Sequence, residues 1–158
     1  MKKHSMFVIL LCAVLLFTCS CGVVNTEPKT FSKSGMTIEL TNAFSEKEVV
    51  SYTATYQSMD IIVLALKEEF TLFGTDTMTL NEYAQLVLDA NLLEAEIITE
   101  DSITYFEYAR EVNGKNLSYL SCVYRGTDAY WLIQFSCDTS NYTKLKETML
   151  QYAATVQV

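Results

Sequence analysis

Hydrophobic and polar positions alternate along residues 103–137, and two groups of turn residues divide this stretch into three parts. Asn113-Gly114 favours a two-residue loop, because a type I′ turn requires a positive φ at both central residues. The run Arg-Gly-Thr-Asp at 125–128 marks the second reversal. The pattern predicts three consecutive antiparallel strands that form a meander.

Two-residue loops at both turns would place Arg110 opposite Leu117 and Cys122 opposite Trp131. Side chains alternate across a strand, so the residues of the meander sort onto two faces. The two predicted faces are Tyr105, Ala109, Leu120, Cys122, Trp131, Ile133 and Phe135 on one side, and Phe106, Tyr108, Leu117, Tyr119, Val123 and Leu132 on the other. Both faces are largely apolar, so we expect other elements to cover both.

The chain before the meander contains further strands. Residues 36–40 alternate in polarity and predict one strand. Residues 51–58 and 60–68 predict a hairpin around Met59-Asp60, and the second of these strands is apolar enough to lie inside a sheet. Residues 70–78 are expected to form a loop, and Ile97-Ile98 a short strand.

Two segments have helical spacing. Thr79 and Glu82 form a capping box before an apolar stripe, which predicts a helix from Leu80 to about Ala90. A second amphipathic stripe runs from Tyr142 to Val156 and predicts a C-terminal helix that packs on the sheet.

The order of elements indicates an α+β fold, with an antiparallel sheet of about five to seven strands, a C-terminal three-strand meander and two flanking helices. Residues 31–158 are expected to form a single domain, because their length suits one core.

The N-terminus has the pattern of an export signal. Two lysines precede an apolar run from Met6 to Thr18, which is too short to span a bilayer. The sequence Thr-Cys-Ser-Cys-Gly that follows resembles a bacterial lipobox, which predicts a lipoprotein signal peptide at 1–20 and lipid, including palmitate, on Cys21. Cys19 is the alternative lipidation site, and an ordinary secretory signal is the alternative to a lipobox. Residues 21–30 are expected to form a membrane-proximal tether.

Composition excludes several classes of function. The chain carries a net charge of −8, and loss of Lys2 and Lys3 with the signal would make it more negative, which argues against binding nucleic acid. The only histidine is His4, inside the predicted signal, so the mature chain lacks the usual general base and the usual zinc ligand.

The remaining chemistry is sparse. Cys122 and Cys137 are predicted to be free, buried thiols, because Cys137 would lie opposite Asn116, roughly 20 Å from Cys122. The acidic run at 94–101 lacks the glycine turn and oxygen spacing of a calcium loop, so no metal site is predicted. Glu68 and Glu69 would point to opposite faces of a strand and cannot serve one site.

Several short patterns resemble small bacterial lipoproteins of the PsbP/Mog1/DcrB-like group. They are Phe31-x3-Gly35-Met36-x-Ile38-x-Leu40-x3-Phe44, Leu80-x-Glu82-Tyr83-Ala84, Gly114-Lys115 with Tyr119, Tyr124-x-Gly126, and Tyr130-Trp131-x-Ile133-x-Phe135. The resemblance implies an antiparallel sheet flanked by helices and a binding or accessory role. It carries over no functional residue, because no catalytic motif defines the group.

We therefore expect a non-enzymatic, lipid-anchored accessory protein on the extracytoplasmic face of a bacterial cell membrane, which binds another envelope protein and needs no cofactor. The alternative is a small-ligand binding lipoprotein whose cavity Tyr105 and Trp131 would line; a hydrolase or transferase is the weakest hypothesis. The candidate binding surface comprises Tyr105, Tyr108, Arg110, Tyr119, Tyr130 and Trp131, although these aromatic residues also suit a sheet core.

Overall fold

The computed structural model describes residues 27–158. In chain order the elements are β1 (Pro28–Lys33), β2 (Met36–Thr41), β3 (Ser45–Lys47), β4 (Ala54–Gln57), β5 (Ile62–Glu69), α1 (Phe70–Phe73), α2 (Leu80–Ala90), β6 (Ile98–Glu100), β7 (Ile103–Val112), β8 (Lys115–Arg125), β9 (Ala129–Asp138), a 3₁₀ turn (Thr139–Asn141) and α3 (Tyr142–Ala154). The predicted α+β class is confirmed.

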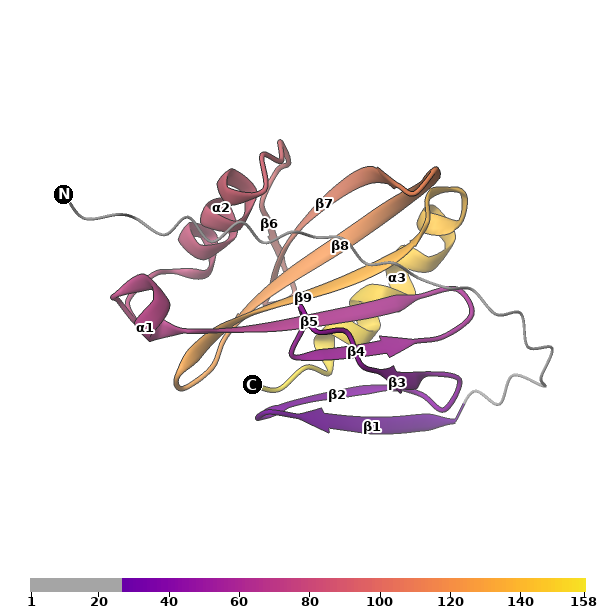
Figure 1. Cartoon of the computed structure of the whole chain (residues 1–158), viewed down its shortest axis with the longest axis horizontal. Helices are drawn as coiled ribbons and strands as arrows, with labels where there is room; N and C mark the ends of the chain where they lie inside the picture. The colour runs from indigo at the N-terminus through magenta and orange to yellow at the C-terminus, as the bar shows by residue number, and fades with distance from the viewer. Residues whose placement is uncertain (1–26) are drawn as a thin grey trace.

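Seven strands form one antiparallel sheet in the order β3-β4-β5-β9-β8-β7-β6, and β1 pairs with β2 in a separate hairpin. The apolar strand β5 lies inside the sheet against β9, as its composition predicted. The predicted strand at 36–40 is β2 of the small hairpin. Figure 1 shows the long meander strands crossing the molecule, with the hairpin along the lower edge.

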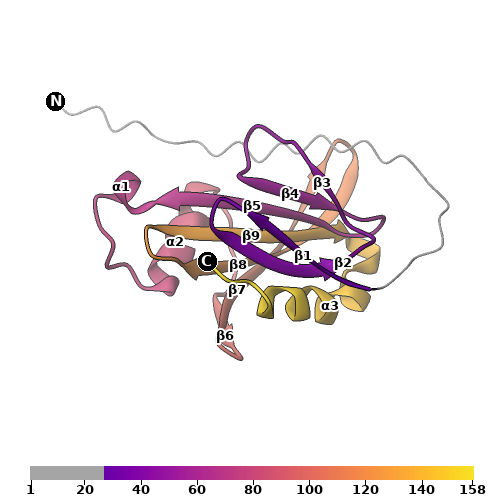
Figure 2. The same cartoon turned by 90° about the horizontal axis from the view of Figure 1, so that it is seen from below.

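Both faces of the sheet are covered, and each has its own core. Helix α2 packs on one face, over Phe106, Val123 and Leu132. Helix α3 and the β1–β2 hairpin pack on the other face, where Met149 and Ala153 join the larger core. Seen from below, the hairpin lies beside α3 and closes that edge of the core (Figure 2). Helix α2 covers only part of this face of the sheet. The side chains on the remaining part of the face are described with the candidate site below.

The ends of α2 follow from local chemistry. Glu82 N–H donates to the Thr79 hydroxyl, and Thr79 N–H donates to the Glu82 carboxylate, so the predicted capping box is present. At the other end, Leu93 N–H donates to the Leu88 carbonyl and Leu92 N–H to Asp89, which is a Schellman arrangement. The left-handed position of that arrangement is occupied by Leu92, with φ of 54°, where glycine is usual.

The register of the first meander hairpin is confirmed, since Arg110 pairs with Leu117. The register predicted for the second hairpin is wrong by two residues: Cys122 pairs with Ile133, and Trp131 pairs with Tyr124. The cause is the turn, which is centred on Thr127-Asp128 and closed by a hydrogen bond from Gly126 N–H to the Ala129 carbonyl. A shift of two residues keeps every side chain on its predicted face.

Other boundaries differ from the prediction. Residues 28–30, assigned to the tether, begin β1, because Pro28 stands at the strand start where its missing N–H costs no ladder bond. The loop expected at 70–78 starts with the one-turn helix α1, which ends at Gly74 in the left-handed conformation. The short edge strand β3 falls in a stretch of polar residues that carries no strand pattern.

Cys122 and Cys137 are free and buried, as predicted, but Cys137 lies opposite Ser118 and not Asn116. The predicted signal peptide and both candidate lipidation cysteines lie outside the described residues. No helix within residues 27–158 is long and apolar enough to cross a membrane.

Candidate functional site

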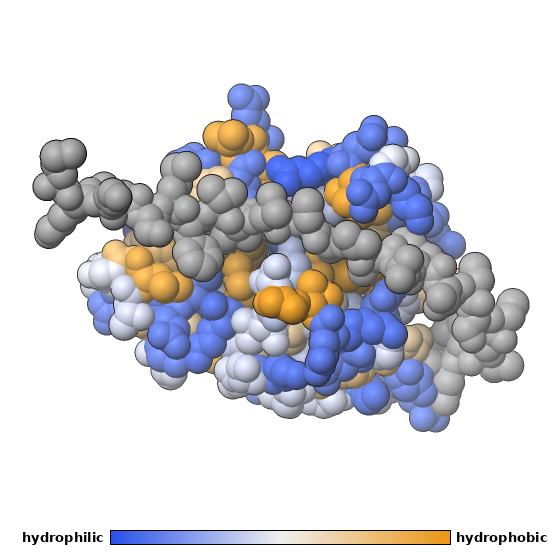
Figure 3. All heavy atoms as spheres, in the orientation of Figure 1, coloured by the Kyte–Doolittle hydropathy of each residue, from blue (hydrophilic) through white to orange (hydrophobic). Residues whose placement is uncertain are grey.

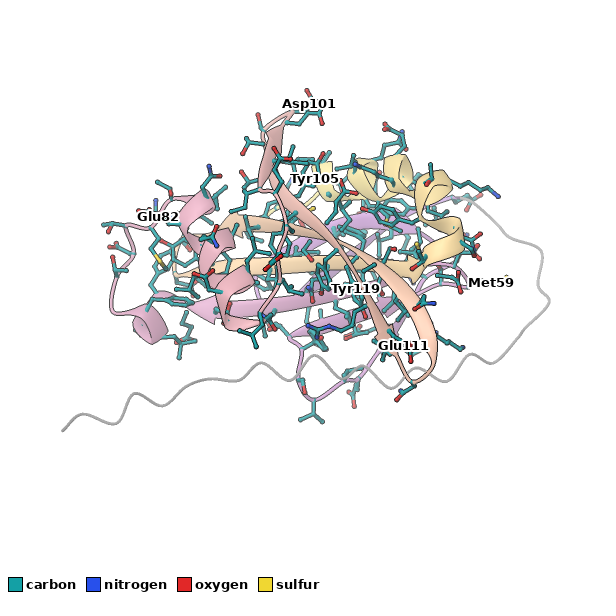
Figure 4. All side chains as sticks on the ribbon, turned by 90° about the horizontal axis from the view of Figure 1, so that it is seen from above. Met59, Glu82, Asp101, Tyr105, Glu111 and Tyr119 are labelled. Atoms are coloured by element: carbon teal, nitrogen blue, oxygen red, sulfur yellow. The ribbon has the colours of Figure 1, made fainter. Side chains whose placement is uncertain are left out.

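The six residues of the predicted binding surface do not share one surface. Tyr105 and Trp131 are buried in the core on the α3 side of the sheet. Tyr130 is buried beneath α2, stacked on Tyr83 with ring centroids 4.8 Å apart. These residues are core members, because alternation within the long strands carries them under the helices. Figure 4 shows Tyr105 on the α3 side and Tyr119 on the opposite side of the sheet.

Tyr108, Arg110 and Tyr119 do lie together, on the part of the α2-side face beyond α2 itself. The Tyr108 and Tyr119 rings stack in parallel, with centroids 4.7 Å apart and planes 4° apart. Arg110 stands two residues further along β7, where its guanidinium donates a 3.4 Å hydrogen bond to the Asn91 carbonyl. Three of the six predicted residues therefore lie on one part of this face.

The same face carries polar side chains in positions that a sheet core normally fills with apolar ones. In register, Ser121 faces Gln134, and Tyr119 faces Ser136. Thr55 reaches the same row through Leu64 of β5. We call this set the polar layer; its members are Thr55, Tyr108, Tyr119, Ser121, Gln134 and Ser136.

Hydrogen bonds within the polar layer fix the orientation of one amide. Gln134 Nε2 donates to the Tyr108 hydroxyl at 2.9 Å and to Ser121 Oγ at 3.0 Å. Among the described residues, Gln134 Oε1, Ser136 Oγ and Thr55 Oγ1 have no hydrogen-bond partner, although Gln134 is only 2 % exposed and Ser136 and Thr55 1 %. Buried polar atoms without a partner are uncommon and costly, so this layer is the main departure from ordinary core construction.

Burial sets the protonation of the two stacked tyrosines. It raises the pKa of Tyr108 well above its ordinary value, and the hydroxyl of Tyr119 next to it raises this pKa further. Burial also raises the pKa of Tyr119, while the charge of Arg110 opposes that shift. Both hydroxyls are therefore neutral donors and acceptors near pH 7.

The outer face of α2 forms a second candidate surface. Glu82, Gln85, Leu86, Asp89 and Ala90 line a shallow hollow of about 540 Å³ along one stripe of the helix. Leu86 is partly exposed there. Figure 4 places Glu82 at this outer side, away from the sheet.

Leu92, directly after α2, is 93 % exposed and has a left-handed backbone. The space-filling view shows apolar surface next to hydrophilic surface at the upper edge of the molecule, above α2 (Figure 3). We call the five residues of the hollow together with Leu92 the α2 surface.

Beneath α2 lies a buried carboxylate. Tyr83 donates a hydrogen bond of 2.5 Å to Glu68, which is 7 % exposed. Burial raises the pKa of Glu68, and the bond from Tyr83 opposes the shift. The prediction that Glu68 and Glu69 cannot share a site agrees with the structure, since Glu68 is buried and Glu69 exposed. No group of three or more metal-ligating side chains occurs within residues 27–158.

Sequence reasoning missed Ser121, Gln134, Ser136, Thr55 and the strained Leu92. A signal for part of this set was present in β9, where Gln134 and Ser136 interrupt an apolar run. Those residues could have been read as inward-facing polar groups. The conformation of Leu92 had no signal, because leucine rarely ends a helix in this way.

Comparison with known proteins finds no matching family model and no matching curated protein. Solved structures do match. The solution structure of cyanobacterial PsbP (CyanoP) from Synechocystis sp. PCC 6803 is 17 % identical, with a TM-score of 0.55 over 90 % of this chain and 98 % of that one.

The Ran-binding protein Mog1p of Saccharomyces cerevisiae is 12 % identical, with a TM-score of 0.56 over 85 % of this chain and 96 % of that one. A crystal structure from Bacteroides thetaiotaomicron VPI-5482 is 13 % identical, with a TM-score of 0.55 over 82 % of this chain; the chain spans about half of that longer protein, 48 %. The chain therefore has the fold of the PsbP/Mog1 group, as the sequence resemblance implied.

Proposed function

We propose that this chain with a PsbP/Mog1 fold is a non-enzymatic accessory protein of the bacterial cell envelope that binds another envelope protein. Lipid on Cys21, with Cys19 as the alternative, anchors it to the extracytoplasmic face of the membrane. Two things support this proposal: the export and lipobox pattern at the N-terminus, and the same fold in a protein described as Ran-binding. Neither depends on catalytic chemistry, and the chain after residue 26 contains no histidine.

The observation that carries the proposal is the left-handed backbone conformation of the exposed residue Leu92. A leucine in the left-handed region costs roughly 1–2 kcal/mol relative to a glycine there, and this leucine is exposed, so the fold gains no burial in return. Residues that break a local rule without a folding benefit are expected at functional sites. A side chain held outward in this way is suited to enter a pocket on a partner protein.

The chemistry of the α2 surface describes that partner. Leu86 and Leu92 provide apolar anchors, while Asp89 and Glu82 border the hollow with negative charge. The whole chain is acidic, with a net charge of −8. We therefore expect a partner segment that combines apolar anchors with lysine or arginine, and an interaction that weakens as salt screens the charges.

The test is crosslinking in the native membrane, followed by affinity capture and mass spectrometry. Leu92→Asn removes the anchor but suits the left-handed backbone, so the variant stays folded. Val50→Asn is the matched control, because Val50 is an equally exposed apolar side chain in the β3–β4 connection. We expect the wild type and the Val50 variant to capture the same envelope protein and the Leu92 variant to lose it. Capture that is unchanged by Leu92→Asn, or absent from the wild type, contradicts the proposal.

The lipid anchor is tested separately. A clickable palmitate analogue should label the wild-type chain, and Cys21→Ser should lose both the label and the membrane fraction. Cys19→Ser should retain both; the reverse result would assign the lipid to Cys19. Export without any lipid label would refute the anchor while leaving the α2 surface to be tested by itself.

The alternative of a cavity lined by Tyr105 and Trp131 does not fit, because both side chains lie in a packed core. A ligand hypothesis has support only from the polar layer, which lies on the opposite face of the sheet.

A further inference from the structure

The polar layer has a chemical pattern that the fold does not need. Strand β9 places Gln134 and Ser136 where its neighbours on the same face are Tyr130 and Leu132, both core residues. Replacing buried polar atoms that lack partners with apolar atoms of the same shape would ordinarily stabilise a protein. The fold therefore retains these groups at a cost.

The orientation of the Gln134 side-chain amide shows which hydrogen-bonding group the polar layer lacks. Both hydrogens of Nε2 are used, by Tyr108 and Ser121, so Oε1 is left as an acceptor that requires an N–H or O–H donor. Two residues along β9, Ser136 Oγ–H supplies a donor with no partner among residues 27–158. The residues that carry this acceptor and this donor therefore point to the same face of β9, with their Cα atoms about 7 Å apart.

Charge narrows the class of ligand. The polar layer contains no carboxylate and no ammonium group, and its two tyrosine hydroxyls are neutral. The nearest charge is Arg110, at the edge of the layer and directed to the Asn91 carbonyl. A ligand with a full charge would be desolvated here without a compensating partner, so the layer suits a neutral one.

We propose that the polar layer binds a small neutral molecule through a group that presents a hydrogen-bond donor beside an acceptor. The ligand's donor bonds Gln134 Oε1, its acceptor receives the Ser136 hydroxyl, and its apolar part contacts the Tyr119 ring. Thr55 Oγ1, one strand beyond Leu64, provides a further polar contact at the far side. Amides and hydroxyl-bearing rings both have this chemistry.

The experiment uses the full-length chain in detergent and two probes, N-acetylglycinamide for the amide class and glucose for the hydroxyl class. Binding is followed by saturation-transfer NMR and by the shift in melting temperature. We expect at least one probe to bind at millimolar concentration. The probe that binds shows whether the ligand belongs to the amide class or to the hydroxyl class. Ser136→Ala and Gln134→Met should each weaken that binding by about tenfold or more.

Ser118→Ala is the matched control, because Ser118 is also a buried serine of the meander, but it lies on the α3 side and its hydroxyl bonds Thr139 at 3.0 Å. This variant should melt at a lower temperature and keep the wild-type affinity. Without any probe, Ser136→Ala should melt at a higher temperature than the wild type, since its hydroxyl lacks a partner within the fold.

Three results would overturn the proposal. One is that neither probe binds. Another is that Ser136→Ala binds the probe as the wild type does. The third is that Ser136→Ala melts at a lower temperature without ligand, because its hydroxyl would then be satisfied within the fold or by a bound water.

Discussion

Tyr83 donates a hydrogen bond to the Glu68 carboxylate beneath α2, and the pair links the helix to the interior strand β5. Burial raises the pKa of Glu68 above its ordinary 4.5, so the folded state holds a proton that the unfolded chain has already released. Stability attributable to Glu68 is thus complete at low pH and declines as pH rises from about 4.5 through the folded pKa.

Glu68→Gln should remove this pH dependence. We expect the variant to equal the wild type below pH 4.5 and to be more stable than it at pH 7–8, because a neutral amide replaces a buried charge. The measurement is urea unfolding at a series of pH values. A stability difference that is constant with pH would show that Glu68 does not titrate in this range.

Tyr83→Phe tests the other partner. Removing the hydroxyl leaves the Glu68 carboxylate without its donor, so we expect a loss of about 1–3 kcal/mol in the free energy of unfolding at pH 7 and a smaller loss at pH 4. Tyr52, a partly buried tyrosine on the same side of the sheet, serves as the matched control position for tyrosine-to-phenylalanine replacement. Equal losses at both pH values would contradict a charge-dependent bond.

Glu107 of β7 links α3 to the meander through side-chain hydrogen bonds. It accepts hydrogen bonds from the Tyr142 hydroxyl and from Lys146 Nζ, both at 2.5 Å. Glu107→Ala should cost about 1–3 kcal/mol, because two charge-assisted bonds are lost at a half-buried position. Lys33→Ala, which breaks the exposed pair with Glu46, should cost clearly less than Glu107→Ala, because solvent screens an exposed ion pair. Denaturant unfolding of both variants compares the two losses directly.

Both cysteines of the domain should be unreactive in the folded chain. Burial raises the pKa of Cys122 to about 12 and that of Cys137 to about 11, so almost no thiolate is present at pH 7.5. Iodoacetamide treatment followed by peptide mapping should leave both unmodified in the native state and modify both in denaturant. Rapid native modification of either thiol would indicate local opening of the α3-side core.

Leu92→Asn should stabilise the domain while weakening partner binding. Asparagine tolerates the left-handed region better than leucine, so we expect a gain of about 0.5–1 kcal/mol in the free energy of unfolding. Leu86→Asn is the comparison, since it removes an exposed leucine from helical backbone and should not stabilise. A destabilised Leu92 variant would mean that the side chain makes a contact important to the fold.

Local sequence patterns determined most of the architecture. The capping box at Thr79 specified where α2 begins, and Asn113-Gly114 specified the first hairpin, because each depends on residues close together in the chain. Alternation in the long strands sorted both faces correctly even where the second turn was misplaced, since a shift of two residues preserves the face.

Only the tertiary structure decided which parts of those faces are covered. Tyr130 is fully buried in the core beneath α2, whereas Tyr108 packs against that core and is only partly buried. The amino-acid pattern of the sheet does not encode where a helix will end above it. The orientation of Gln134, the missing partners of Ser136 and the strain at Leu92 likewise depend on contacts between distant segments. Local propensity is set by neighbours in sequence, whereas burial and hydrogen-bond satisfaction are set by neighbours in space. The candidate sites are defined by burial and by missing hydrogen-bond partners. They could therefore be identified only in the folded chain.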